Sequence, residues 1–202
     1  MTNSIEIFRA VKTGTDINVP QKYRPTMRPP VNVPYIVDNL WEWKRPEQYP
    51  NRRYSAFASP EKKQALSSAG KNAIAYRVSL LGNYKLCQLK GNKNFINNED
   101  SKYHKDCVDL RKLMFSRLNQ PWVESDLHAK SDAGRLWMPC LRKEEVDSLF
   151  ENTKSLREIR QEIYDAITYW NDIVLIRQDG EIPDEKGEIF FEAFDGYRLL
   201  PI

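Results

Sequence analysis

The chain has 202 residues, of which 41% are hydrophobic, 29% charged and 11% aromatic. This composition is typical of a globular protein and excludes a disordered one, and the length suits one fairly large domain over residues 1–202. The 31 basic and 28 acidic residues give a net charge of +3, which permits a polyanionic partner without requiring one. The three cysteines are odd in number and far apart, so neither a disulfide framework nor a paired zinc motif is indicated.

The N-terminus carries no apolar signal region, and no run of about 18 apolar residues occurs in the chain. We therefore expect no membrane partner. The expected location is the cytoplasm, either of the cell that produces the protein or of a target cell. The two histidines belong to no metal-binding motif, and no metal site is predicted.

The first part of the chain alternates between strand signals and proline. Residues 5–11 alternate in the way a strand does, and five prolines between residues 20 and 34 disfavour regular structure. Asp38 is the expected N-cap of a short helix that must end before Pro46. The tryptophans of that helix are expected to be packing anchors.

A strand is predicted next, over residues 54–58. Ser59 followed by Pro60 matches an N-cap with proline at the first helical position. The helix that follows is expected to stop at Gly70. Arg52 and Arg53, just before the strand, lie in a turn-like context that suits solvated side chains, although they could also reach a phosphate.

The middle of the chain mixes strands and helices. Residues 74–81 and 84–89 read as strands of a hairpin turning at Gly82-Asn83. Apolar residues at helical spacing predict a long helix over residues 99–118, and a stronger pattern predicts another over 155–170.

The C-terminal part returns to strands, over residues 173–177, 188–193 and 197–201, with turns at Asp179-Gly180 and Asp195-Gly196. Strands at both ends with helices between them predict an α+β fold in which the terminal strands share one sheet.

Three of these segments carry the residues that suggest chemistry. They are EIFRAV with Arg9, SAFASP with Ser59, and GEIFFE with Glu188. Their order resembles the arginine, serine and glutamate signature of the ADP-ribosyltransferase superfamily. The resemblance implies a single domain with a mixed, split β-sheet core and with flanking and inserted helices. It also implies that NAD is the substrate.

The resemblance assigns roles to several residues. A carboxylate would stabilise positive charge that develops on the ribose as the nicotinamide bond breaks, and an arginine fork would bind the diphosphate. Serine hydroxyls would hold the ribose, and an aromatic ring would stack on the nicotinamide. The implied catalytic residues are Glu188 and Glu192, either of which could be the catalytic carboxylate because both lie on one side of a strand. The implied NAD-binding residues are Arg9, Tyr54, Ser55, Phe57 and Ser59.

The acceptor of ADP-ribose is not fixed by the sequence. Superfamily members that modify arginine carry Glu or Gln two residues before the catalytic glutamate, and here that position is Lys186. Because of this departure, we slightly favour a nucleic acid as the acceptor of ADP-ribose. A protein acceptor stays open. The resemblance further implies a toxin, effector or defence protein, possessing an antitoxin or immunity partner where the system requires one.

Each residue also has a structural interpretation. Arg9 could be a surface arginine on an edge strand, Ser59 a helix cap alone, and Glu188 a solvated strand end. The alternative function is a noncatalytic module that binds RNA or protein through the basic and aromatic stretches NRRY and LKGNKNF.

Overall fold

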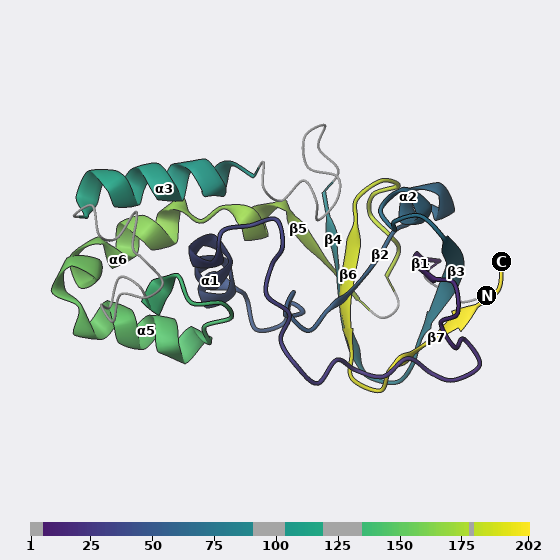
Figure 1. Cartoon of the computed structure of the whole chain (residues 1–202). Coiled ribbons are helices and arrows are strands. Elements are labelled where there is room, and N and C mark those ends of the chain that lie inside the picture. Colours follow the sequence, from purple (N-terminus) through teal and green to yellow (C-terminus); the bar gives the residue numbers. More distant parts are fainter. Residues whose placement is uncertain (1–5, 91–103, 119–134, 178–179) are drawn as a thin grey trace. The chain divides into compact units, whose positions relative to one another are not determined.

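The computed structural model describes residues 6–90, 104–118, 135–177 and 180–202 (Figure 1). The chain divides into two compact units. One, here called the sheet unit, comprises Met1–Met27, Glu47–Asn98 and Asp172–Ile202, and the other, the helical unit, comprises Arg28–Pro46 and Glu99–Asn171. Helices and antiparallel sheets together confirm the predicted α+β class. A single ADP-ribosyltransferase-like domain over residues 1–202 stays a prediction.

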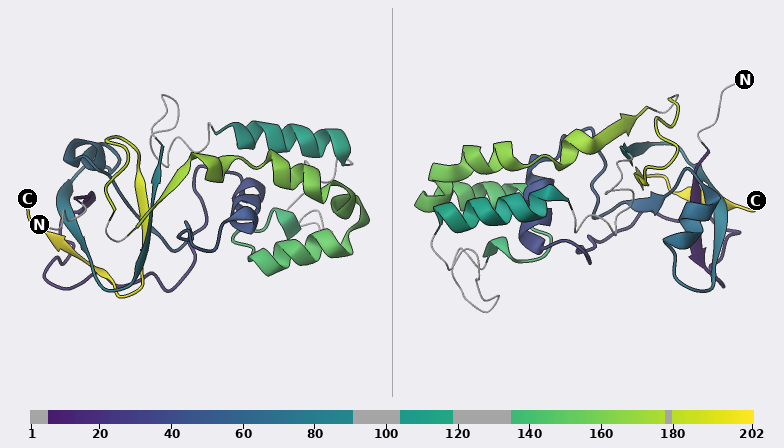
Figure 2. Two further views of the ribbon diagram at one scale, coloured as in Figure 1. Left: turned by 180° about the vertical axis from the view of Figure 1, so that it is seen from behind. Right: turned by 90° about the horizontal axis from the view of Figure 1, so that it is seen from above.

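The sheet unit contains two antiparallel sheets (Figures 1 and 2). The three-stranded sheet has the order β1-β3-β7, so the first and last strands share one sheet, as the sequence predicts. The four-stranded sheet has the order β2-β6-β4-β5. The bounds of the strands are β1 Phe8–Lys12, β2 Ala56–Ala58, β3 Ala73–Leu80, β4 Tyr84–Leu89, β5 Ile173–Ile176, β6 Ile189–Ala193 and β7 Tyr197–Leu200.

The hairpin predicted at Gly82-Asn83 is wrong, because β3 and β4 belong to different sheets and do not pair. The turn instead carries the chain from one sheet to the other, and the turn at Asp195-Gly196 does the same between β6 and β7. A hydrogen bond joins these two turns, because the Asn83 amide donates to the Asp195 carboxylate at 2.7 Å. Turn residues predict a reversal of the chain, but the partners of the two strands depend on distant residues.

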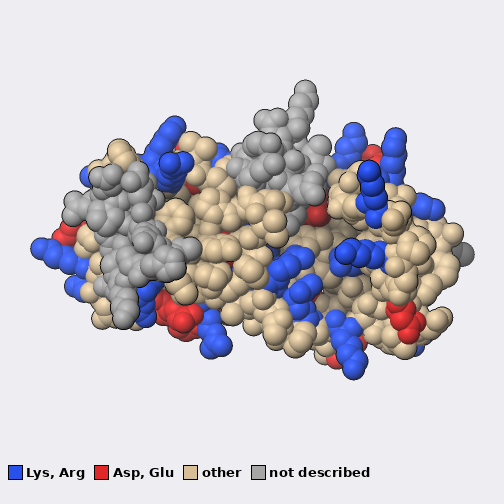
Figure 3. Space-filling model, viewed as in Figure 1, with Lys and Arg blue, Asp and Glu red and all other residues tan. Residues whose placement is uncertain are grey.

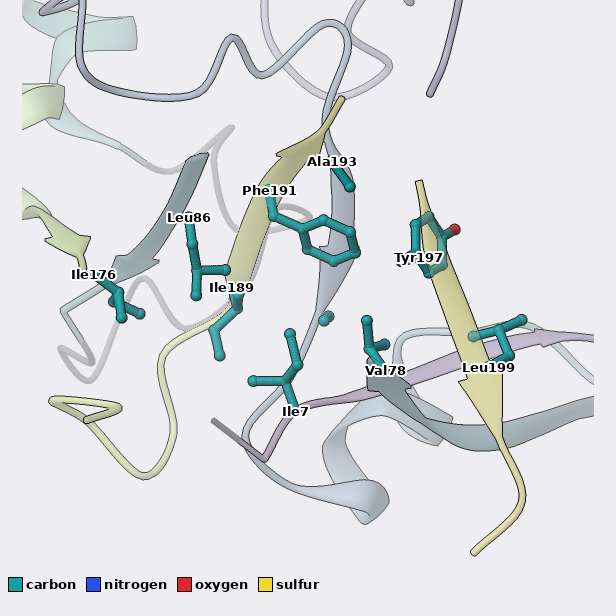
Figure 4. Packing of buried hydrophobic residues seen from close by; sticks show 10 residues of the cluster. Ile7, Val78, Leu86, Ile176, Ile189, Phe191, Ala193, Tyr197 and Leu199 are labelled. Carbon is teal, nitrogen blue, oxygen red and sulfur yellow. The ribbon is translucent and has the colours of Figure 1, made fainter. Parts of the chain in front are cut away.

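The core of the sheet unit lies between the two sheets. Residues of the four-stranded sheet and of the three-stranded sheet point toward one another in Figure 4, with the Phe191 and Tyr197 rings 5.1 Å apart and nearly perpendicular. Every residue of β6 is buried. β6 lies between β2 and β4 in its sheet and contributes Ile189, Phe191 and Ala193 to this core. Burial of each Ile or Phe side chain contributes roughly 1.5–3 kcal/mol.

The helical unit contains α1 Tyr35–Lys44, α3 Lys105–Arg117, α5 Lys143–Asn152 and α6 Lys154–Ala166. A short 3₁₀ turn over Tyr169–Asp172 begins in this unit and ends at the first residue of the next segment of the sheet unit. Figures 1 and 2 show α3 and α5 flanking α6. The amphipathic pattern correctly predicts α6, whose Leu156, Ile159 and Ile163 are buried. α5 has no counterpart among the expected elements, and part of the expected helix 99–118 lies outside the described residues.

The start of α1 differs from the expectation. The helix begins at Tyr35, after Pro34, so Asp38 lies inside it and is not its N-cap. Pro34 supplies no backbone donor to the first turn and has a fixed φ, which favours an early start. The predicted end before Pro46 is confirmed, since the helix stops at Lys44. Trp41 and Trp43 are buried, as expected for packing anchors.

A buried carboxylate that the sequence did not reveal organises the helical unit. Asp106 is fully buried and accepts hydrogen bonds from Trp41 Nε1, Thr168 Oγ1 and the Thr168 and Tyr169 amides, at 2.6–2.9 Å. The bond from Trp41 ties α1 to α3, and the others tie α3 to the segment after α6. The Trp41 and Tyr169 rings stack at 4.1 Å beside this group.

Candidate functional site

The three segments that carry the predicted signature come together in the sheet unit. Phe8 of β1 and Ser59, which follows β2, exchange two backbone hydrogen bonds of 2.7 Å each. β2 pairs with β6, with Ala58 opposite Ile189. When that antiparallel register is continued by one residue, Ser59 lies opposite Glu188. The strand with Arg9, the strand with the serine and the strand with the glutamate are therefore neighbours.

Ser59 does not cap a helix, and this expectation is corrected. α2 spans Lys62–Ser67, and its N-cap position is Glu61. Ser59 is buried, and its hydroxyl donates to Gln64 Oε1 at 2.7 Å. The Ser-Pro pair cannot act as a cap because the backbone of Ser59 continues β2 and bridges β1, so the helix starts two residues later.

A small pocket opens where β1 and β2 separate. Its volume is about 60 Å³, several times the roughly 15 Å³ that one water needs. Its size suits a phosphate-sized group better than an entire dinucleotide. The lining contains three cationic and three tyrosine side chains and no acidic one, from these residues: Arg9, Lys22, Tyr23, Arg24, Tyr54, Ser55, Ala56, Phe191, Ala193 and Tyr197.

Arg9 brings a guanidinium to the wall of this pocket. One of its terminal nitrogens, Nη1, donates to the Phe57 carbonyl, which fixes the guanidinium against β2. Its Nε is buried and has no hydrogen-bond partner within the described residues. A buried donor without a partner costs about 1–3 kcal/mol. The positive charge of the guanidinium at the pocket wall favours an anionic ligand there.

Tyr23 and Tyr54 form a wall of the pocket. Their rings are nearly parallel, with centroids 5.8 Å apart and an interplanar angle of 22°. Ser55 is buried next to Tyr54, and its hydroxyl donates to the Asn51 carbonyl at 2.8 Å. Lys22 and Arg24 are exposed on either side of Tyr23. In Figure 3, Lys and Arg side chains gather on the sheet unit with few acidic ones among them.

The predicted carboxylates lie on the other face of the four-stranded sheet. Ala56 and Ala58 of β2 and Phe191 and Ala193 of β6 face the core and the pocket, and this is called the pocket face. Side chains alternate along a strand. The opposite face, called the carboxylate face, therefore carries these residues: Phe57, Ser59, Glu188, Phe190 and Glu192.

The structure thus divides the predicted site residues into two groups. Arg9, Tyr54 and Ser55 line the pocket. Phe57, Ser59 and the two glutamates belong to the carboxylate face, where the Phe57 ring lies 6.3 Å from that of Phe190. β2 is the edge strand of its sheet, so the two faces meet along it. A ligand that contacts both groups must bend around this edge.

The two glutamates have different surroundings. Glu192 is 5% exposed and accepts a hydrogen bond at each oxygen, from Tyr23 Oη at 3.0 Å and from the Asn51 amide at 2.7 Å. It anchors the segments that carry Tyr23 and Asn51. Glu188 is 8% exposed and stands at the start of β6, where its carbonyl accepts from the Leu89 amide at 2.9 Å.

Arg52 and Arg53 are buried, at 9% and 2% exposure, so the expectation of solvated side chains is wrong. Two hydrogen bonds stabilise the turn that carries them. The Arg53 amide donates to Asn51 Oδ1 at 3.0 Å, and the Asn51 amide donates to the Glu192 carboxylate. The stretch NRRY is therefore part of the fold, with two buried arginines and with Tyr54 in the pocket wall. Of the second basic stretch, LKGNKNF, residues 91–95 lie outside the described residues.

Sequence reasoning missed Gln64, Tyr23 and Asn51. Each forms a hydrogen bond with a residue more than a hundred positions away in the chain, and no local motif marks it.

Comparisons of the chain with protein-family models, curated proteins and solved structures found no match. In the part of the chain that the structure describes, no helix is long and apolar enough to cross a membrane.

Proposed function

We propose that the protein is an NAD-dependent ADP-ribosyltransferase that transfers ADP-ribose to a macromolecular acceptor. One observation supports the proposal: β1, β2 and β6 are neighbours around Ser59, so the segments that carry Arg9, Ser59 and Glu188 lie side by side, with Arg9 at the pocket and the other two on the carboxylate face. A split core of the ADP-ribosyltransferase type is part of the same proposal. The division into two sheets that meet at the Phe8–Ser59 bridge supports it.

The pocket is the proposed binding site of the diphosphate of NAD. Arg9 supplies a guanidinium that the Phe57 carbonyl fixes at the pocket, and Lys22 and Arg24 add two exposed charges. Tyr54 and Ser55 stand next to Arg9 and supply an aromatic face and a hydroxyl. The three positive charges exceed the two negative charges of a diphosphate, so the pocket can neutralise that group completely.

On the carboxylate face, Glu188 is the proposed catalytic residue. The bond between nicotinamide nitrogen and ribose carbon breaks, and its electron pair leaves with nicotinamide. The Glu188 carboxylate stabilises the positive charge that develops on the ribose. The acceptor atom then bonds to that carbon and loses its proton. Glu192 is excluded from this role in the proposal because both its oxygens hold Tyr23 and Asn51.

The proposal requires one ligand to contact both faces of β2. NAD has the length and the flexible diphosphate for this, with its diphosphate at Arg9 and its nicotinamide ribose beyond the edge of β2. Phe57 lies on the carboxylate face beside this edge and is the proposed partner of the nicotinamide ring.

The test is incubation of the purified protein with NAD labelled in its adenylate part and a cell extract. Labelled macromolecule and free nicotinamide are expected, and Glu188→Gln should abolish both while leaving the fold intact. Separating the labelled product into protein and nucleic acid identifies the acceptor. Unchanged NAD in the presence of folded wild-type protein contradicts the proposal.

A toxin, effector or defence role, acting in the cytoplasm, is proposed with the same activity. Expression of the wild-type chain should arrest growth, and Glu188→Gln should relieve the arrest. A chain that rescues growth when expressed alongside would be the antitoxin or immunity partner.

The second candidate is a noncatalytic nucleic-acid-binding module. The stacked Tyr23 and Tyr54 rings, with exposed Lys22 and Arg24 as the chain neighbours of Tyr23, favour it, because aromatic and cationic groups together bind single strands. Salt-sensitive RNA binding without NAD consumption, unchanged in Glu188→Gln, would establish this candidate in place of the transferase.

A further inference from the structure

The segment that carries Glu188 is held by two glutamine side chains. Gln88 of β4 is fully buried, and its amide donates to the carbonyls of Asp184 and Gly187 at 2.6 and 2.9 Å. Gln64 of α2 donates from Nε2 to the Lys186 carbonyl at 2.6 Å. These contacts fix the backbone that leads into Glu188. Gln88 belongs to the core, whereas Gln64 is half-buried and contributes little to it.

Gln64 also connects that segment to Ser59. Its Oε1 accepts from the Ser59 hydroxyl at 2.7 Å. One amide group therefore bridges Ser59 and the Lys186 carbonyl, which lies two residues before Glu188, the residue opposite Ser59. No other side chain in the described part of the chain makes both contacts.

The orientation of the bridge follows from the chemistry of its partners. A backbone carbonyl only accepts, so the NH₂ group of Gln64 must face Lys186. The carbonyl oxygen of Gln64 then faces Ser59 and can only accept, so the Ser59 hydroxyl must donate its single proton there. Ser59 Oγ is left with lone pairs and without a proton for any other partner. A ligand group at Ser59 must therefore be a hydrogen-bond donor, such as a ribose hydroxyl.

We propose that Gln64 is a positioning residue of the active site: it sets the backbone before Glu188 and turns Ser59 into an acceptor for a ribose hydroxyl. This inference rests on the proposed transferase activity. Gln64 does not touch the reacting atoms. Its removal should leave NAD binding through Arg9 intact and impair the step that needs Glu188 and Ser59 in register.

The variants separate the two halves of the bridge. Gln64→Met removes both hydrogen bonds and keeps the volume and helix propensity of the side chain. Gln64→Glu keeps an acceptor for Ser59 but sets a carboxylate oxygen against the Lys186 carbonyl. The matched control is Gln161→Met, the same change at an exposed position of α6. The variants are compared by kcat and KM for NAD consumption, by the Kd of NAD and by thermal unfolding.

For Gln64→Met we expect kcat to fall about 10- to 100-fold, because small displacements of a reacting group have effects of that size. The Kd of NAD and the Tm should stay near those of the wild type, and Gln161→Met should be unchanged throughout. Gln64→Glu should lose a similar factor in kcat, since the contact with Lys186 is broken. Wild-type kcat in Gln64→Met overturns the inference, and so does a loss of NAD affinity at unchanged kcat.

An independent measurement separates failure of this inference from failure of the proposed function. Amide hydrogen exchange of the peptide covering residues 184–190 should be faster in Gln64→Met than in the wild type and in Gln161→Met. If the wild type does not consume NAD, the proposed function fails, whatever the exchange result. If the wild type is active, Glu188→Gln is inactive, and both exchange and kcat of Gln64→Met equal those of the wild type, the positioning role alone fails.

Discussion

Phe8 and Ser59 exchange both of their backbone hydrogen bonds, each 2.7 Å long, although 50 residues of chain separate them. This bridge joins β1 of one sheet to the end of β2 in the other. It brings Arg9, the serine and Glu188 onto three neighbouring strands. The candidate site therefore depends on the junction between the two sheets, and substitutions that test it must distinguish the anchors of the junction from the reacting groups.

Glu192 is expected to behave as an anchor. In Glu192→Gln, the side-chain carbonyl can still accept from the Asn51 amide, and the amide can donate to Tyr23 Oη, so both contacts survive without the charge. NAD consumption should stay within about threefold of the wild type, a difference of less than about 0.7 kcal/mol. Steady-state kinetics of this variant and of Glu188→Gln, which should be inactive, make the comparison.

Glu192→Ala provides the structural counterpart, since it leaves the Asn51 amide without its partner. It should reduce the free energy of unfolding by roughly 1–3 kcal/mol, measured by urea denaturation. Inactivation of Glu192→Gln with unchanged stability would identify Glu192 as the catalytic carboxylate instead.

Gly187 is expected to tolerate no side chain. A Cβ at this position would lie 1.7 Å from the Leu89 carbonyl oxygen, which is backbone of β4 and cannot move alone. Gly187→Ala should therefore displace the start of β6 and lower stability by more than about 3 kcal/mol, measured by urea denaturation, with loss of NAD consumption. Gly70→Ala is the control, because a Cβ there meets no atom within 4 Å. Equal stability of the two variants would contradict this account of Gly187.

Much of the fold follows from local patterns in the sequence. The spacing of Leu156, Ile159 and Ile163 predicts α6, and the strand-like segments 74–81 and 188–193 match β3 and β6 to within one residue. These predictions succeed because the hydrophobic period of an element is a property of adjacent residues. The order of Arg9, Ser59 and Glu188 along the chain could be read in the same way.

The remainder depends on contacts between distant residues. Gly82-Asn83 signals a turn, yet the turn crosses between sheets because Asp195 binds it from 112 residues away. Ser59 followed by proline is the local signal of a helix cap, but the backbone of Ser59 forms a β-bridge with Phe8 instead. The division of the site residues between two faces also escapes prediction, since it is set by the register of β2 against β6.

Asp106 is expected to be the most sensitive polar residue of the helical unit. Asp106→Ala leaves Trp41 Nε1 and the Thr168 and Tyr169 amides without their acceptor in a buried site. Unfolding free energy should fall by roughly 3–5 kcal/mol, measured by urea denaturation followed by circular dichroism. Asp109→Ala, at an exposed position of the same helix, should change it by less than about 0.5 kcal/mol. Similar stability of the two variants would show that the buried contacts are not needed.

The Cys87 thiol should resist alkylation. Burial raises its pKa well above the ordinary value of 9.0, and the nearby Lys85 charge offsets this only in part. Iodoacetamide at pH 8 should modify the half-buried Cys107 and Cys140 and reach Cys87 only in denaturant, as resolved by peptide mass spectrometry. Rapid native modification of Cys87 would contradict its burial.

The same shift gives Cys87 a dependence of stability on pH. The pKa of the Cys87 thiol is higher in the folded than in the unfolded protein. The thiol therefore contributes its full share of the folding free energy below the unfolded pKa near 9.0, and this share decreases as the pH rises above that value. The stability difference between the wild type and Cys87→Ala should therefore shrink between pH 8 and pH 10. Urea denaturation at both pH values measures it, and a constant difference would contradict the shift.

Arg9 is expected to control NAD affinity more than turnover. Arg9→Lys keeps one charge but loses the planar fork, in which the Phe57 carbonyl fixes Nη1. The Kd of NAD should rise about 10- to 100-fold, corresponding to roughly 1.4–2.8 kcal/mol, with kcat at saturating NAD changed less. Isothermal titration and steady-state kinetics separate the two quantities. Lys63→Met, which removes an exposed charge from α2, is the control for a nonspecific effect of charge and should leave the Kd unchanged. If Arg9→Lys lowers kcat and leaves the Kd unchanged, the pocket does not bind the diphosphate, and a ligand that bends around β2 is excluded.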